Sequence, residues 1–120
     1  MPMLYLHTSF DVGALATSQI MLDCADAVAR VLGKPDKYVM VLLESNVDLW
    51  CGAGEEPAAW AELVSIGELT PDETENARKA LADVLKSKLS LCSLHLHIHC
   101  QSVKSGSSSD NVSCLHAIHQ

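Results

Sequence analysis

The residue best suited to chemistry is Pro2, which directly follows Met1. Proline is small, so we expect Met1 to be removed and the Pro2 nitrogen to become a secondary amine instead of an amide. An α-amino group has an ordinary pKa of about 7.7–8.0, and burial in an apolar pocket lowers this pKa because desolvation disfavours the charged form. A neutral amine can take a proton from carbon or attack a carbonyl group. The alternative is that Pro2 is simply a tolerated second residue.

Three histidines that alternate with apolar residues form a second candidate site. His95, His97 and His99 would lie on one face of a strand, with apolar residues on the other face. Adjacent members of such a row, about 6.8 Å apart, can share a zinc ion. The same pattern suits a polar strand face in a channel or an interface. We favour the polar face and expect neither a metal nor a cofactor.

The composition limits the possible partners. The 120 residues carry a net charge of −7, which argues against nucleic-acid and anionic-membrane partners because both require clustered Lys and Arg. No signal peptide is visible, and no apolar run approaches the ~20 residues of a membrane span. The five cysteines are widely spaced and form no Cys-x-x-Cys pair. Free thiols in a reducing compartment such as the cytoplasm are therefore expected.

Two similar strand–helix–strand units account for most of the chain. In the first unit, the apolar pattern predicts a strand over residues 3–8 and a helix that is capped by Thr17 or Ser18 and runs to about Leu32. A continuous apolar run then predicts a strand over residues 38–43, as expected for a strand covered on both faces or packed in an interface.

The second unit repeats this order. A strand is predicted over residues 60–66, Thr70 and Glu73 match a capping box that begins a helix, and residues 94–100 alternate as a strand. We therefore predict an α+β fold with two β-α-β repeats, one four-stranded sheet and both helices on one face. The other face of the sheet would lack cover, so an oligomer is expected.

The composition changes near the end of the chain. Residues 102–109 are mostly Ser, Gly and Lys, which is typical of a flexible linker. We assign residues 1–104 to one domain and residues 105–120 to a divergent tail that we expect to be partly disordered.

Several short motifs occur together in an order that resembles the macrophage migration inhibitory factor family, which includes D-dopachrome tautomerase. The motifs are Met1-Pro2 before a strand, Gly33-Lys34-Pro35, Tyr38-Val39-Met40-Val41, Glu56-Pro57-Ala58-Ala59 and Ser65-Ile66-Gly67. The resemblance covers residues 1 to about 99. The Gly-Lys-Pro-x-x-Tyr-Val-Met and Glu-Leu-Val-Ser-Ile-Gly stretches are most similar to plant-type members of this tautomerase superfamily.

This resemblance implies a homotrimer whose sheets surround a central channel, with three sites at the subunit boundaries. It also implies an isomerase that catalyses keto–enol tautomerisation of small aromatic α-keto acids such as phenylpyruvate, and of dopachrome-type compounds. The family includes animal cytokines that leave the cell without a signal peptide. The alternative is therefore a cytokine-like signalling or binding protein, secreted in this way, that binds a receptor and catalyses weakly or not at all.

The resemblance also implies roles for three residues. Pro2 matches the general base that moves a proton between carbon and oxygen. Lys34 matches the lysine that holds the substrate carboxylate, and Ile66 matches the residue whose backbone amide contacts the substrate. As alternatives, Lys34 also suits the C-terminus of a helix, and Ile66 also suits a hydrophobic core.

The last third of the chain departs from the family pattern. His97 stands where animal members have an active-site tyrosine, and His99 stands where they have asparagine and plant-type members often have lysine. We expect both imidazoles to point into the site of the neighbouring subunit and to bind a carboxylate or act as an acid. The change removes an aromatic wall from the site, and the family's aromatic C-terminal segment is missing as well.

Overall fold

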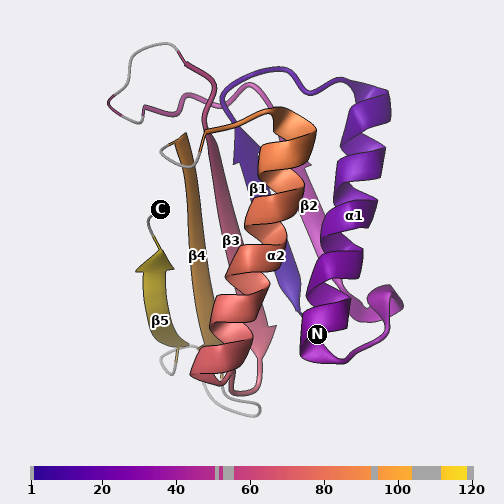
Figure 1. Ribbon diagram of the computed structural model, residues 1–120, viewed down its shortest axis with the longest axis vertical. Coiled ribbons are helices and arrows are strands. Elements are labelled where there is room, and N and C mark those ends of the chain that lie inside the picture. Colours follow the sequence, from indigo (N-terminus) through magenta and orange to yellow (C-terminus); the bar gives the residue numbers. More distant parts are fainter. Residues whose placement is uncertain (1, 51, 53–55, 93–94, 104–111, 119–120) are drawn as a thin grey trace.

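Five strands form one mixed sheet, and two helices pack on one of its faces (Figure 1). The strand order is β2-β1-β3-β4-β5. This computed structural model describes residues 2–50, 52, 56–92, 95–103 and 112–118, and for the last of these ranges only the backbone. Met1 and residues 104–111, which include most of the linker expected over residues 102–109, lie outside the described residues.

Each half of the chain forms one β-α-β unit. The first unit consists of β1 (Met3–Thr8), α1 (Ala14–Leu32), the short 3-10 helix η1 (Asp36–Tyr38) and β2 (Met40–Glu44). The second unit consists of β3 (Ala59–Ile66), α2 (Pro71–Leu89) and β4 (Leu96–Val103). Within each unit the two strands are parallel, and β1 and β3 pair antiparallel where the units meet. The predicted α+β fold is thus confirmed, with two repeats and both helices on one face of the four strands β1–β4.

The hydrophobic core lies between the helices and the sheet, because every second strand residue faces the helices. The largest fully buried aliphatic side chains come from both layers and are Leu4, Ile20, Val28, Leu63, Leu81 and Leu85. Burial of each such side chain contributes about 1.5–3 kcal/mol to folding.

The remaining strand residues lie on the face opposite the helices, which we call the open face. On β1–β4 the open face carries Met3, Tyr5, His7, Met40, Leu42, Glu44, Trp60, Glu62, Val64, Ile66, His97 and His99. Three apolar side chains of the open face are each about half exposed: Met40 (51%), Leu42 (47%) and Ile66 (49%). Both helices lie on the other side of the sheet (Figure 1), so this apolar surface is available to a partner.

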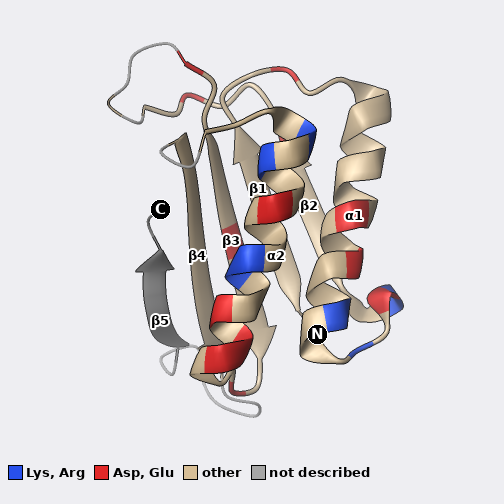
Figure 2. Ribbon diagram, in the orientation of Figure 1, with Lys and Arg blue, Asp and Glu red and all other residues tan. Residues whose placement is uncertain are grey.

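The start of α2 agrees with its predicted capping box. Thr70 Oγ1 accepts a hydrogen bond from Glu73 N–H, and the Glu73 carboxylate accepts one from Thr70 N–H. Acidic residues occupy the first turn of α2, and Lys86 and Lys88 occupy the last (Figure 2). This distribution of charge complements the helix dipole.

The start of α1 differs from its prediction. The helix begins at Ala14, directly after Gly13, and no side chain caps it, so the predicted caps at Thr17 and Ser18 were wrong. Thr17 Oγ1 donates to Gly13 O at 2.7 Å and Ser18 Oγ donates to Ala14 O at 3.5 Å. Both hydroxyls therefore bond to the carbonyl one turn earlier, which is a role inside a helix.

The end of the chain also differs from its prediction. β4 runs over residues 96–103 instead of 94–100, because its pairing with β3 continues as far as Val103 opposite Ile66. A further strand, β5 (Val112–Ile118), pairs antiparallel with β4. The composition had predicted a partly disordered tail here, so this strand was not expected. The division of the chain at residue 104 stays a prediction.

Candidate active site

Pro2 is held at the start of β1, between the beginning of β2 and the end of β3. Its carbonyl oxygen accepts a hydrogen bond from Met40 N–H at 3.0 Å, and Met3 is paired with Val64 of β3. The Pro2 side chain is fully buried, and alternation with Met3 places it on the helix side of the sheet. If a free Pro2 nitrogen kept these apolar surroundings, its neutral form would be favoured.

Lys34 lies where the chain turns from α1 towards β2. Gly33 ends the helix in the left-handed region, with φ of 65°, and Lys34 N–H donates to Ala29 O at 3.0 Å. Glycine suits this position because it has no Cβ to oppose a positive φ. Lys34 is exposed, and the connection that carries it ends at Met40, the residue hydrogen-bonded to Pro2.

The end of β3 brings Ile66 to the same end of the sheet. Because β3 runs antiparallel to β1, Ile66 lies just beyond Val64, the partner of Met3. Ile66 is 49% exposed, so it is not a core residue of the single chain. Gly67 follows with φ of 100° and donates to Val103 O at 2.7 Å. A Cβ at Gly67 would have free space around it, so the backbone conformation is what favours glycine there.

Pro2, the Lys34 connection and Ile66 thus share one end of the sheet, where α1 ends (Figure 1). Tyr38 belongs to the same connection, although it was not predicted from the sequence to be a site residue. Its ring is 48% exposed, and Lys37 Nζ lies 5.3 Å from the ring centroid, which is a cation–π distance. The Gly-Lys-Pro-x-x-Tyr motif could have indicated Tyr38 as a site residue, because it places Tyr38 four residues after Lys34.

A pair of carboxyl groups joins α1 to η1 near this connection. The side chains of Asp26 and Asp36 share a hydrogen bond, and this bond is the main reason that the pKa of Asp26 is raised. Desolvation and the negative charges of Asp36 and Asp23 raise this pKa further, whereas the positive charge of Arg30 lowers it.

Two of the described cysteines are too deeply buried to act as nucleophiles. Burial raises the pKa of Cys24 to about 12 and the pKa of Cys100 to about 11. The thiolate is the reactive form, so neither side chain provides it near neutral pH. Cys92 is exposed, and all three thiols are free, as the sequence predicted for them.

His97 and His99 lie on the open face, away from Pro2 of the same chain. His97 pairs with Trp60 of β3, and Trp60 pairs with His7 of β1. His7 is five residues along β1 from Pro2, which corresponds to about 17 Å at the rise of a strand. A single chain therefore does not bring His97 to its own Pro2. The entry of His97 and His99 into the site of a neighbouring subunit stays a prediction.

The predicted row of three histidines is broken at its first member. His95 precedes β4, and its Nδ1 lies 3.3 Å from Glu56 Oε2. Within the described ranges, no group of three or more His, Cys, Asp or Glu side chains is arranged to hold a metal ion. The polar strand face is thus the interpretation that the geometry of the described residues favours over a zinc site.

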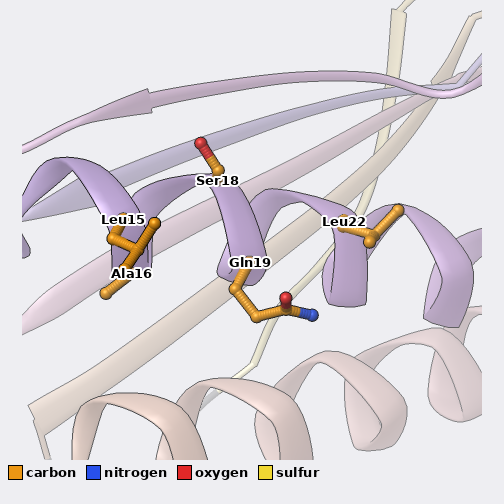
Figure 3. Close-up of a pocket in the computed structure, with 5 residues that line it drawn as sticks. All are labelled: Leu15, Ala16, Ser18, Gln19 and Leu22. Atoms are coloured by element: carbon orange, nitrogen blue, oxygen red, sulfur yellow. The ribbon is translucent and has the colours of Figure 1, made fainter.

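A hollow of about 610 Å³ lies along the first half of α1. It is lined by Leu15, Ala16, Ser18, Gln19 and Leu22 (Figure 3). None of these five side chains titrates near neutral pH, so they offer no group for acid–base chemistry. The predicted site residues Lys34 and Pro2 lie at the other end of α1.

Comparison with known proteins identifies a family over nearly the whole chain. Residues 1–115 match the family model for macrophage migration inhibitory factor (MIF), which extends the resemblance beyond residue 99. A macrophage migration inhibitory factor homolog from Trichinella spiralis is 29% identical over 99 residues, covering 82% of this chain and 86% of that protein.

Solved structures share the fold. MIF2 from Leishmania major superimposes with a TM-score of 0.80 at 18% identity, covering 94% of this chain and 97% of that one. Pt0534, solved after inactivation by 2-oxo-3-pentynoate, gives a TM-score of 0.77 at 16% identity, covering 92% and 95%. Neither named organism is a plant, so the similarity to plant-type members stays a prediction. No helix in the described ranges is long and apolar enough to cross a membrane.

Proposed function

The chain belongs to the macrophage migration inhibitory factor family, and from this premise we propose that it is a keto–enol tautomerase of small aromatic α-keto acids. Phenylpyruvate and dopachrome-type compounds are the proposed substrates. The observation that supports this proposal most directly is the convergence of three groups at one end of the sheet. These groups are the buried Pro2, the exposed Lys34 connection and the exposed Ile66.

The proposed reaction begins with a chain from which Met1 has been removed. The neutral Pro2 nitrogen takes the proton from the carbon next to the keto group. The electron pair of that C–H bond forms a carbon–carbon double bond, and the keto oxygen becomes an enolate that takes up a proton. Lys34 would pair with the substrate carboxylate, and the Ile66 backbone amide would donate to the substrate. All of these groups come from the protein, so we propose no cofactor.

The complete site is proposed to form at the boundary between subunits of a homotrimer. Proteins of this family commonly form trimers, and the open face of this chain has apolar side chains at Met40 and Leu42 that a partner would cover. In this arrangement His97 and His99 of one subunit would enter the site around Pro2 of the next. Either imidazole could then bind the substrate or carry a proton.

A second candidate function is signalling through a receptor, as in the animal cytokines of the family. The departure at His97 favours it, because it removes an aromatic wall from the site. The free thiols of Cys24, Cys92 and Cys100 are typical of a reducing cytoplasm, which is where we place the tautomerase. The signalling protein would additionally have to leave the cell.

A Pro2→Gly variant distinguishes these two functions. We expect it to lower kcat/KM for enol-phenylpyruvate by at least about a hundredfold, since general-base catalysis typically contributes that much. Pro57→Gly, which alters an exposed proline in a loop, should keep wild-type activity. Mass spectrometry must first show that Met1 is absent. Full activity in Pro2→Gly would reject Pro2 as the general base. An inactive wild-type trimer with a free Pro2 would reject the tautomerase and leave the binding role.

A chemical label tests the same amine independently. Because a protein of this fold is inactivated by 2-oxo-3-pentynoate, we expect this reagent to modify Pro2. The nitrogen would bond to the alkyne carbon and its proton would pass to the neighbouring carbon, so the peptide gains the whole mass of the reagent. Protection by phenylpyruvate is expected. Labelling spread over the lysines, with an unmodified N-terminal peptide, would contradict a reactive Pro2.

A further inference from the structure

Trp60 and His97 form a stacked pair on the open face of the sheet. They occupy adjacent strands, β3 and β4, and are directly paired in the ladder. Their ring centroids are 4.2 Å apart, and their planes differ by 17°. Parallel strands place paired side chains on the same face, so the stack follows from the register of the two strands.

The stack presents an apolar ring surface in an otherwise polar row. On the other side of Trp60, its partner His7 is engaged with Glu44, with Nε2 3.2 Å from Oε1. Trp60 and His97 are each only partly buried within the single chain. The indole is therefore the large apolar group of this row, and the imidazole lies flat against it.

The position of the stack excludes a role at Pro2 of the same chain. It lies about 17 Å along the sheet from that residue, and Pro2 faces the helix side whereas the stack lies on the open face. If the stack has a role in the reaction, it must serve the site of another copy of the chain.

We propose that Trp60 is a specificity-determining residue, whose indole receives the aromatic ring of a keto acid bound near Pro2 of the neighbouring subunit. This inference rests on the proposed function. His97 stands where animal members of the family have a tyrosine, and an imidazole offers less apolar surface than that ring. Trp60 supplies the missing aromatic wall from the adjacent strand, and its stacking fixes the orientation of the His97 ring.

Steady-state kinetics with two substrates tests the specificity. Deuterium exchange at carbon 3, followed by NMR, reports the tautomerisation of both phenylpyruvate and 2-oxobutanoate. We expect Trp60→Ala to raise KM for phenylpyruvate roughly three- to tenfold with little change in kcat, and to leave 2-oxobutanoate unchanged. Trp60→Phe should have a KM for phenylpyruvate close to that of wild type. Trp50→Ala, at a 76% exposed tryptophan, should behave as wild type. An equal effect on both substrates would reduce Trp60 to a structural residue and overturn the proposal.

A binding experiment separates this inference from the proposed function. In a Trp50→Phe background, Trp60 is the single tryptophan, so its fluorescence reports directly on its ring. We expect 3-phenylpropanoate, which cannot enolise in this way, to change the emission of Trp60 saturably, and propanoate to leave it unchanged. A His97→Ala change should weaken the binding.

The outcomes of the two experiments are distinct. Saturable binding of the phenyl acid without turnover would support the aromatic surface while the tautomerase proposal fails. If Trp60→Ala leaves the kinetics with phenylpyruvate unchanged, the tautomerase proposal stands and the role of Trp60 is overturned. A Trp60 emission that does not respond to 3-phenylpropanoate at any attainable concentration would also overturn that role.

Discussion

At the scale of single residues, Asp26 makes stability depend on pH, because its pKa is raised in the folded chain. Folding raises the pKa of Asp26 above its ordinary value of 3.8, chiefly through the side-chain hydrogen bond to Asp36. The native state therefore binds more protons than the unfolded chain between pH 3.8 and the raised pKa. Stability should fall as the pH rises from about 3.8 through the raised pKa, and the penalty should persist at neutral pH.

Replacing the Asp26 carboxyl should remove this loss of stability at neutral pH. We expect Asp26→Asn to raise the melting temperature at pH 7 and to change it little near pH 3, because Asn can keep the hydrogen bond without the charge. Differential scanning calorimetry at both pH values provides the measurement. Asp83→Asn, at an exposed position of α2, controls for the change in net charge. A similar gain at both pH values would show that charge repulsion is not the cause.

Pro2 shows how far a single residue could be interpreted from the sequence. Its identity and its place before a strand indicated a candidate base. Its burial, by contrast, depends on packing between β2, β3 and the helix layer, and these contacts join residues that are remote in the sequence. The family resemblance supplied Lys34 and Ile66, and the antiparallel pairing of β1 with β3 explains why Ile66 lies near Pro2.

At the scale of the elements, the starts of the two helices predict different losses of stability when a threonine is replaced by alanine. Thr70 caps α2 through Glu73 N–H, so Thr70→Ala should lower the free energy of unfolding by about 1 kcal/mol. Thr17 satisfies no free helix N–H and only donates to Gly13 O, so Thr17→Ala should cost much less. Urea denaturation of both variants measures the difference. Equal losses would show that the cap does not determine where α2 begins.

These helices also show why some boundaries could be predicted and others could not. Thr70, Pro71 and Glu73 form a local signal that specifies its own hydrogen bonds. Thr17 and Ser18 look similar in the sequence, but either residue type can also bond back to a carbonyl inside a helix. The choice depends on Gly13, whose φ of 88° allows the helix to start earlier.

In the strands, too, local sequence patterns could be interpreted, whereas contacts between residues remote in the sequence could not. The alternation in β4 predicted which residues share a face, and the structure bears this out for His97 and His99. The stack of His97 on Trp60 could not be predicted, because it depends on the register between β3 and β4, and a shift by one residue reverses the faces. β5 was missed because a short, weakly apolar segment depends on β4 for its pairing.

At the scale of the whole molecule, the sheet has two unlike faces. One face packs against α1 and α2 and forms the core, whereas the open face has exposed apolar groups at Met40, Leu42 and Ile66. Water-exposed apolar surface on a sheet favours association with a partner, and a homo-oligomer with closed symmetry is the commonest solution. The proposed trimer would bury this face and place each Pro2 near the His97 and Trp60 of a neighbour.

A charge placed on the open face should therefore dissociate the oligomer. Leu42 on β2 is 47% exposed in the single chain, and Leu42→Asp would bury an unpaired carboxylate in the assembly, which is strongly unfavourable. We expect wild type to sediment as a trimer at micromolar concentration and Leu42→Asp to sediment as a folded monomer with little tautomerase activity. Leu22→Asp is the matched control, because Leu22 is 52% exposed but lies on α1. A Leu42→Asp trimer as stable as wild type would exclude β2 from the interface, and dissociation of both variants would mean that the helix layer also forms part of it.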